Sequence, residues 1–250
     1  MPLVRTAVDD GVAQVTLDDP TRRNVLSAEL VRELTQTFDD LDRRDDVTTV
    51  VLTGAGPAFC AGADLADLLA AADGDPSGVR RVYSGFDRVR RSPLVTIAAV
   101  NGPTVGAGLN LALVCDVRIA STSAWFDCRF LDIGLHPGGG HLRMLRELVG
   151  PQTAAAMVLC RQRLSAEAAV SAGLAFAVTT DDELLPTASD LARRAASAPR
   201  DLTLLTKRSL QEEPSLSPEQ AMAVEEERQL WSLGLPTTSE QLRTHAGRKR

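Results

Sequence analysis

The sequence has no long hydrophobic run and no excess of positive charge. Its longest strongly apolar stretch, residues 94–100, has the length of a buried strand and is far shorter than the roughly 18–20 residues that cross a bilayer. Lysine and arginine number 27 against 33 aspartate and glutamate, so the net charge is -6 and there is no global basic field to hold nucleic acid. We expect neither a membrane span nor a nucleic-acid partner.

Cysteine and histidine, the residues that most often bind zinc, are also scarce. The chain has three histidines, and its four cysteines, Cys60, Cys115, Cys128 and Cys160, are widely separated with no C-x-x-C pair. We expect reduced thiols packed in the core and no metal site. Residues 1–5 lack the charged region and apolar core of an export signal, so we expect a cytoplasmic protein.

The sequence does contain a regular alternation of strand and helix patterns over its first half. The chain has 250 residues, 44% of them hydrophobic, which suits a sizeable globular core. Strands are predicted at residues 4–8, 12–17, 47–52, 94–100 and 117–120, and helices at 27–44, 65–72, 79–89 and 106–114. From about Gly140 the pattern is helical only, with caps at Ser165 and Ser217. This order predicts an α/β core followed by a helical C-terminal region.

Two strand–turn–helix junctions are rich in small residues. Residues 59–65 (FCAGADL) follow the strand predicted at 47–52, and residues 101–110 (NGPTVGAGLN) follow the strand at 94–100. At such junctions backbone N–H groups are unpaired, and small residues let a ligand oxygen approach closely. The junctions predict either an oxyanion hole with two main-chain donors or simply two tight turns with close helix packing. A dinucleotide motif is not matched, because Leu111 stands where its last glycine would be.

Read together, seven ordered segments resemble the enoyl-CoA hydratase/isomerase (crotonase) family over nearly the whole chain. The segments are residues 20–27, 59–65, 99–102, 115–120, 133–140, 164–169 and 172–174. The resemblance implies a crotonase fold of stacked ββα turns in residues 1–195, with residues 196–250 as a helical region that makes oligomer contacts and covers the active site. It also implies a homotrimer or dimer of trimers, and an acyl-CoA thioester as ligand with no further cofactor.

The resemblance places the binding site at the two glycine-containing turns. It implies that the backbone amides of Ala61 and Ala107 are the oxyanion-hole donors for the thioester carbonyl, each contributing about 2.7–4 kcal/mol. The residues implied to line the site are Arg23, Ala61, Gly62, Ala63, Asp64, Leu65, Gly106, Ala107, Phe130 and Gly138. Arg22, Arg23 and Lys207 are either neighbours of the CoA phosphates or adenine, or ordinary solvated charges.

Two positions depart from the family pattern. Hydratases of this family use two glutamates, and the aligned positions here hold Asn110 and Phe130. An Asn amide can orient water but cannot accept its proton, and Phe can do neither, so standard hydratase activity is not expected. His136 is a candidate acid/base group, because histidine changes its charge near neutral pH, and Asp132 is a candidate to orient it. The alternative for both residues is an ordinary surface turn.

Three functions remain open. The first is an enzyme that acts on acyl-CoA through a stabilised enolate, as a hydratase-like lyase or a double-bond isomerase, with Asn110, His136 and Asp132 beside the two amides. The second is a non-catalytic acyl-CoA binder or carrier. The third is a scaffold in a fatty-acid enzyme assembly, which predicts no CoA binding. Exchange of the α-proton of a bound acyl-CoA with solvent is expected for the enzyme but not for the carrier.

Overall fold

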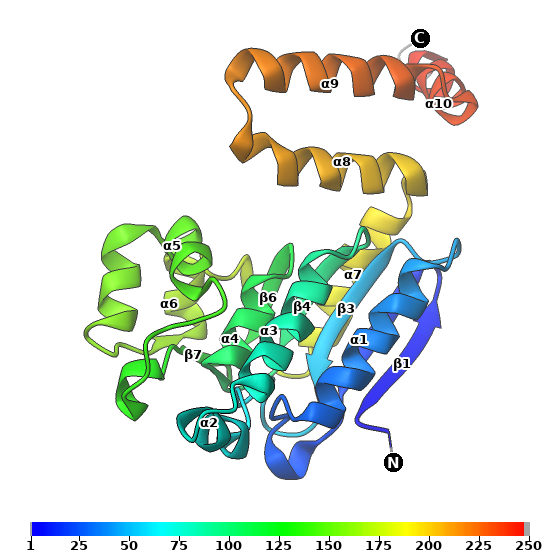
Figure 1. Ribbon diagram of the computed structural model, residues 1–250. Coiled ribbons are helices and arrows are strands. Elements are labelled where there is room, and N and C mark those ends of the chain that lie inside the picture. The colour runs from blue at the N-terminus through cyan, green and yellow to red at the C-terminus, as the bar shows by residue number, and fades with distance from the viewer. Residues whose placement is uncertain (1, 248–250) are drawn as a thin grey trace.

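Strands and helices alternate through most of the computed structural model, which describes residues 2–247 (Figure 1). The larger sheet has the strand order β1-β2-β3-β4-β6-β9. Its strands are β1 (Val4–Asp9), β2 (Val12–Leu17), β3 (Thr49–Gly54), β4 (Val95–Val100), β6 (Val117–Ser121) and β9 (Ala177–Thr179). Only the β1–β2 hairpin is antiparallel; the other neighbours run parallel.

A smaller sheet collects the short segments that leave the ends of the parallel strands. It contains β5 (Thr104–Val105), β7 (Trp125–Asp127) and β8 (Leu164–Ser165). Two isolated bridges, Leu26 to Ala63 and Cys60 to Thr104, extend the same pairing towards the N-terminus. Each turn of the chain thus supplies a strand to the large sheet, a short strand to the small sheet and then a helix. This is the ββα repeat that the resemblance implied.

Helices cover both faces of the large sheet. One face is covered by α1 (Ala28–Asp42), α3 (Ser77–Arg90) and α4 (Ala107–Leu113), and the other by α7 (Leu184–Ala196). Helix α1 begins at Ser27, whose side chain accepts a hydrogen bond from the Leu30 amide. The apolar side of the helix is buried, with a relative exposure of 3% or less for Leu30, Leu34, Phe38 and Leu41. The helix predicted from residue 27 is therefore confirmed.

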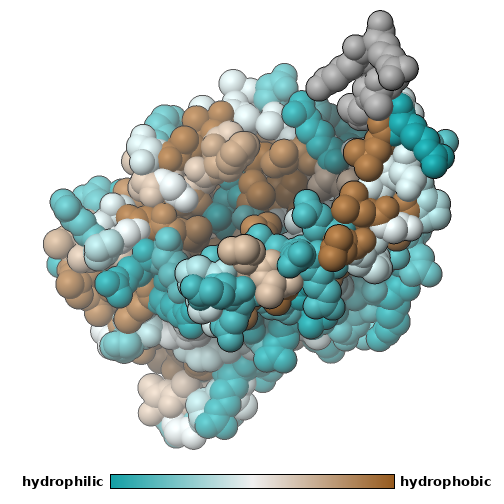
Figure 2. Space-filling model, turned by 90° about the horizontal axis from the view of Figure 1, so that it is seen from above, coloured by the Kyte–Doolittle hydropathy of each residue, from teal (hydrophilic) through white to brown (hydrophobic). Residues whose placement is uncertain are grey.

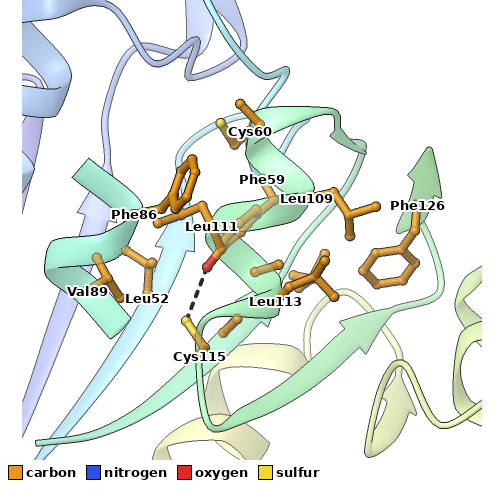
Figure 3. Packing of buried hydrophobic residues seen from close by; sticks show 14 of the residues in the cluster. Leu52, Phe59, Cys60, Phe86, Val89, Leu109, Leu111, Leu113, Cys115 and Phe126 are labelled. Carbon is orange, nitrogen blue, oxygen red and sulfur yellow. Dashed lines mark hydrogen bonds between the residues drawn. The ribbon is translucent and has the colours of Figure 1, made fainter. Parts of the chain in front are cut away.

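Helix α4 lies in the centre of the core rather than on its surface. All seven of its residues are buried, and Leu109, Leu111 and Leu113 point outward from it to different neighbours (Figure 3). Figure 3 shows Phe59 and Phe86 beside one side of this helix and Phe126 beside the other. Because such cores are close-packed, the N-terminus of α4 is held rigidly at the end of β4.

The remaining helices lie beside the sheet or follow the core. Helices α5 (His141–Val158) and α6 (Ala166–Ser171) lie beside β6 and β7, whereas α2 (Leu65–Ala72) lies below α3 (Figure 1). The 3-10 helices are η1 (Pro20–Arg22) and η2 (Phe130–Ile133). After α7 come α8 (Arg200–Glu212), η3 (Glu213–Ser215), α9 (Pro218–Leu233) and α10 (Pro236–Gly247), which extend away from the sheet (Figure 1). Ser217 and Gln220 form the predicted capping box of α9. Residues 248–250 of the predicted C-terminal region lie outside the described residues.

The prediction that only helices follow Gly140 is wrong. Strands β8 and β9 lie beyond that point and pair with β7 and β6. They were missed because each has only two or three residues, too few to show an alternating pattern, and because partners distant in the sequence stabilise them.

The cysteines differ from expectation at one position. Cys60, Cys115 and Cys128 are buried free thiols, as predicted, but Cys160 is exposed. It follows the end of α5, where the chain turns at the surface through Arg161 with φ of 56°. Within residues 2–247, no helix is both long enough and apolar enough to cross a membrane.

Candidate functional site

A cavity of about 820 Å³ opens where the two glycine-containing turns meet α2 and α3. Most of the predicted site residues line it: Arg23, Ala61, Gly62, Ala63, Asp64, Leu65, Gly106, Ala107, Asn110, Phe130 and His136. Asp132 and Gly138 are not among the residues that line it. The wall is largely apolar, with Val25, Leu68, Val79, Val82 and Leu135 contributing. Such a cavity has the character of a small-molecule site.

Backbone hydrogen bonds join the two turns directly. The Cys60 amide donates to the Pro103 carbonyl at 3.3 Å, and the Val105 amide donates to the Cys60 carbonyl at 3.1 Å. Gly62 has φ of 103°, and a Cβ there would lie 2.8 Å from the Val105 carbonyl oxygen and 3.6 Å from the Ala107 nitrogen. Gly62 is thus required both by the left-handed backbone and by the close approach of the second turn.

The prediction that Ala61 supplies an oxyanion-hole donor is wrong. Its amide already donates to the Arg23 carbonyl at 2.9 Å, so this N–H is not available to a ligand. Among the described residues, no protein acceptor lies within hydrogen-bonding distance of the Ala63 or the Ala107 amide. Both residues line the cavity, and Ala107 is the first residue of α4. The available pair of main-chain donors is therefore Ala63 and Ala107.

Asp64 and Arg22 form one edge of the cavity. The Asp64 side chain caps α2 by accepting from the Ala66 amide at 3.1 Å and pairs with Arg22 at 2.5 Å. Burial raises the pKa of Asp64, but the Ala66 amide and Arg22 outweigh this and lower it below the usual range. Asp64 is thus an ionised cap at neutral pH, and Arg22 and Arg23 supply positive charge at the same edge.

Asn110 lies on α4 one turn beyond Ala107 and is held by two contacts. Its Nδ2 donates to the Gly138 carbonyl at 3.1 Å, which turns Oδ1 towards Nδ1 of His141 at 2.6 Å. Nδ1 must therefore carry the imidazole proton, and Nε2 accepts from the Cys128 thiol at 3.2 Å. Sequence reasoning missed this network, because its members come from separate elements.

The candidate acid/base residues lie in different surroundings. Nδ1 of His136 donates to the Pro137 carbonyl at 2.8 Å, which leaves Nε2 of the neutral ring with its lone pair. Asp132, predicted to orient His136, instead lies 3.8 Å from Arg161. The aligned Phe130 ring packs edge-on against His141, with 4.9 Å between ring centroids.

Lys207 is remote from this cavity and buried, so neither of its two expected roles, a neighbour of CoA or a solvated charge, applies. Its ammonium donates to the Leu94 carbonyl at 2.6 Å and pairs with Asp116 at 2.7 Å. Leu94 precedes β4, whereas the cavity lies beyond the opposite end of that strand. Within residues 2–247 no group of three His, Cys, Asp or Glu side chains is arranged to hold a metal ion.

Tyr83, which the sequence analysis did not single out, also lines the cavity. It lies on α3 beside the buried side of that helix, its side chain is partly exposed, and no motif marks it. A composition signal existed, because it is the single tyrosine of the chain.

Comparisons with known proteins agree with this architecture. The family model described as enoyl-CoA hydratase/isomerase matches residues 7–240. A Mycobacterium tuberculosis protein named "Probable enoyl-CoA hydratase EchA14" is 48% identical over 209 residues, covering 83% of this chain and 80% of that protein. The 1,2-epoxyphenylacetyl-CoA isomerase of Escherichia coli is 36% identical over 208 residues, covering 80% and 78%. The crystal structure of an enoyl-CoA hydratase from Bacillus anthracis superposes with a TM-score of 0.91 at 26% identity, covering 98% and 96%. The chain therefore belongs to the enoyl-CoA hydratase/isomerase (crotonase) family.

Proposed function

We propose that the protein binds an acyl-CoA thioester with its carbonyl oxygen between the amides of Ala63 and Ala107, and that it stabilises the enolate formed when the α-proton leaves. The observation that carries this proposal is the pair of amides without a protein acceptor among the described residues, both at one apolar cavity. Two fixed donors aimed at a developing oxyanion are worth far more inside such a cavity than in water.

Helix α2 supports an acyl chain as the part of the ligand that fills the cavity. It is strongly apolar, yet none of its residues is buried. Leu68 and Ala71 face the cavity, while Leu65 at its mouth is 66% exposed. An apolar helix in this state gains free energy when an alkyl chain covers it, at about 0.8 kcal/mol for each methylene buried.

The charged part of CoA has cationic neighbours at the cavity edge. Arg22, Arg23 and Arg129 all line the cavity. Arg22 is paired with Asp64, and Arg129 with Asp127 at 2.9 Å, so both are held in place. The net charge of the chain is -6, so these local arginines are the available attraction for an anionic ligand.

His136 is our candidate for the base that removes the α-proton. It lines the cavity, and the Pro137 contact leaves Nε2 free to accept a proton. Asp132 is not needed for this orientation, because a backbone carbonyl already sets the tautomer. Standard hydration is not expected, since Phe130 is apolar and both polar atoms of the Asn110 side chain already have partners. Crotonyl-CoA should therefore be hydrated at a rate at least about 10²-fold below that of ordinary hydratases.

The same contacts favour a second candidate, a non-catalytic acyl-CoA carrier. If His136 does not act as a base, the site still holds a thioester but transfers no proton. Incubation with decanoyl-CoA in deuterated water separates the two. We expect deuterium at the α-carbon, and loss of that exchange in His136→Ala. Binding without exchange would establish the carrier, and no binding by calorimetry would overturn both.

A proline substitution tests the amide pair itself. Ala107 is the first residue of α4, a position that accepts proline, so Ala107→Pro removes the N–H while the helix is kept. We expect exchange to fall about 10²–10³-fold, the usual effect of losing one oxyanion-hole donor. Ala28→Pro is the matched control, because Ala28 is the exposed first residue of α1. Equal exchange in Ala107→Pro and Ala28→Pro would contradict the proposed donor.

A further inference from the structure

The direction of the Ala63 amide is set by its own peptide plane. Within residues 2–247 every peptide bond is trans, so the carbonyl of one residue and the N–H of the next point in opposite directions. The Gly62 carbonyl accepts a hydrogen bond from the Leu26 amide at 2.8 Å. The Ala63 N–H therefore points away from Leu26. Because Ala63 lines the cavity, this contact directs its N–H to the cavity side.

Residues 23–26 thus support the Ala63 donor. The Ala61 amide donates to the Arg23 carbonyl at 2.9 Å, and an isolated parallel bridge joins Leu26 to Ala63. This pairing belongs to neither sheet and is too short to hold itself together. Its geometry therefore depends on the contacts that keep residues 23–26 in place.

Asn24 provides those contacts from within the protein. Its side chain is fully buried, with a relative exposure of 0%. Nδ2 donates to the carbonyls of Ala55, Ala58 and Phe59 at 3.0, 2.8 and 3.2 Å. Oδ1 accepts from the Asp19 amide at 2.9 Å. The carboxamide thus joins residues 23–26 to the loop that leads directly into the first glycine-containing turn.

The backbone at this point needs such support. Arg23 and Asn24 have φ of 53° and 56°, in the left-handed region that side chains other than glycine disfavour. Asparagine tolerates this region better than most residues, whereas arginine does not. Two such residues in succession cost free energy, so the surrounding structure must hold them. The Asn24 amide and its Oδ1 both bond to the Asp19 backbone, which closes the turn around η1.

The loop before the site depends equally on Asn24. Ala58 and Phe59 are fully buried, and no backbone amide of the described residues donates to their carbonyls. A buried carbonyl that loses its partner is costly. Without the carboxamide, this loop would shift to satisfy those oxygens, and the residues that follow it would shift with it.

We propose that Asn24 is a positioning residue of the acyl-CoA site: it holds residues 23–26 against the first glycine-containing turn, so that Leu26 turns the Gly62 carbonyl away from the cavity and the Ala63 N–H towards the thioester oxygen. This inference rests on the acyl-CoA function proposed above. Asn24 is not among the residues that line the cavity, so it acts through the backbone and not on the ligand.

The stretching frequency of the thioester carbonyl reports this geometry without any proton transfer. Hydrogen bonds to the oxygen weaken the C=O bond and lower its frequency, and fixed donors in an apolar cavity do so more strongly than water. Infrared difference spectra of decanoyl-CoA labelled with ¹³C at the carbonyl measure it in the bound state. We expect wild type to lower the frequency below its value in water. Asn24→Gly, which suits a φ of 56°, should keep only the part due to Ala107.

Exchange of the α-proton gives a second measurement. In Asn24→Gly we expect the rate at saturating decanoyl-CoA to fall about 10²-fold, the usual effect of a misplacement of about 1 Å. Affinity should stay within a few-fold of wild type, because the apolar wall of the cavity is unchanged. Asn24→Asp keeps the volume and the acceptor for Asp19 but replaces the donating group by an oxygen. It should show the same losses, and it carries the test where Asn24→Gly does not fold.

Thr96→Val is the matched control for the loss of a buried hydrogen bond. Thr96 is also 0% exposed, its hydroxyl donates to Asp116 at 3.0 Å, and it lies at the opposite end of β4 from the cavity. This variant should be less stable than wild type but keep its carbonyl frequency and exchange rate. Equal losses in Thr96→Val would show a general effect of destabilisation and overturn the inference.

The outcomes also separate this inference from the proposed function. If wild type lowers the carbonyl frequency and the folded Asn24 variants lower it as much, Asn24 does not position the donor, while the acyl-CoA site stands. If wild type binds decanoyl-CoA without lowering the frequency, or does not bind it, the proposed function fails as well.

Discussion

At the scale of single residues, the chain of contacts from Cys128 to Asn110 is a neutral, closed network. Burial lowers the pKa of His141 to about 4. Burial, assisted by the Asp127 carboxylate, raises the pKa of Cys128 to about 12. Both shifts disfavour a thiolate–imidazolium pair, so despite its Cys-His-Asn composition the network is not an activated nucleophile. Its effect is to fix Asn110 and, through it, the Gly138 carbonyl.

The buried imidazole predicts how stability depends on pH. Below pH 6.5 an unfolded chain protonates this histidine, whereas the folded protein keeps it neutral until about pH 4. The unfolded state then binds more protons, so this group reduces the free energy of unfolding as the pH falls through that window, by up to about 3 kcal/mol. Above pH 6.5 the histidine is neutral in both states, so it does not change how the free energy of unfolding varies with pH.

Urea denaturation of His141→Gln at fixed protein concentration checks this effect. The variant is expected to be less stable than wild type at pH 7.5, and the gap should narrow by about 3 kcal/mol by pH 4. His136→Gln is the matched control, because His136 lies on an exposed turn. If the wild-type and His141→Gln curves stay parallel across the window, folding does not lower the pKa of His141.

The same scale shows where sequence reasoning stopped. It found the segment 59–65 as a site but chose the amide of Ala61, which is bonded within the protein, and not that of Ala63, which has no acceptor among the described residues. The choice depends on which amide the neighbouring chain uses, since Arg23 accepts from Ala61 and the Leu26 amide donates to the Gly62 carbonyl. These contacts join segments about forty residues apart, and no local pattern reports them.

At the scale of elements, the long amphipathic segments were predictable and the short ones were not. Helix α1 and strand β4 carry clear periodic patterns, and both were predicted to within two residues at each end. Strands β5, β7, β8 and β9 have three residues or fewer and form because the ββα turns bring their partners together. The cavity depends on these short pieces, since β5 and β7 hold Gly106 beside Cys128. The sequence motifs thus located the site, whereas the positions of its groups could be known only from the three-dimensional structure.

The apolar helix α2 predicts how the affinity for acyl-CoA varies with the length of the acyl chain. Because α2 has no buried residue and faces the cavity, each added methylene should increase affinity about fourfold, equivalent to about 0.8 kcal/mol, until the cavity is full. Ala71→Phe places a ring in that space. We expect it to bind butanoyl-CoA as wild type does but to stop gaining affinity at a shorter chain.

Calorimetric titration with butanoyl-, hexanoyl-, octanoyl-, decanoyl- and dodecanoyl-CoA measures the affinities of the wild-type protein and of Ala71→Phe. Ala70→Phe is the matched control, because Ala70 lies on the same helix but is not among the residues that line the cavity. A wild-type affinity that does not change with chain length would mean that the acyl group lies outside this cavity. Identical series for the two variants would mean that Ala71 does not limit it.

At the scale of the whole molecule, the C-terminal helices leave apolar surface uncovered. Helix α9 has no buried residue, and the one buried side chain of α8 is Lys207. Large hydrophobic side chains on these helices are exposed: Leu210, Met222, Leu230, Trp231 and Leu233, at 42–73%. Figure 2, which views the molecule from this side, shows hydrophobic side chains among hydrophilic ones. Several such residues on one arm mark an interaction surface rather than scattered exposure.

We propose that further copies of the chain cover this surface, giving a homotrimer or a dimer of trimers. Leu210 is the sharpest probe, because it is 73% exposed and lies at hollows on both sides of α8, one beside Lys207 and the other beside α9. In sedimentation equilibrium we expect the wild-type protein to have a mass of three or six times 26.7 kDa. The Leu210→Glu variant should shift towards the mass of a single chain, because burying an unpaired carboxylate at an interface costs several kcal/mol. Leu69→Glu, an equally exposed leucine on α2 at 68%, should keep the wild-type mass. Loss of assembly in both variants would show general sensitivity to surface charge, and a wild-type mass of one chain would mean that α8 and α9 do not join copies.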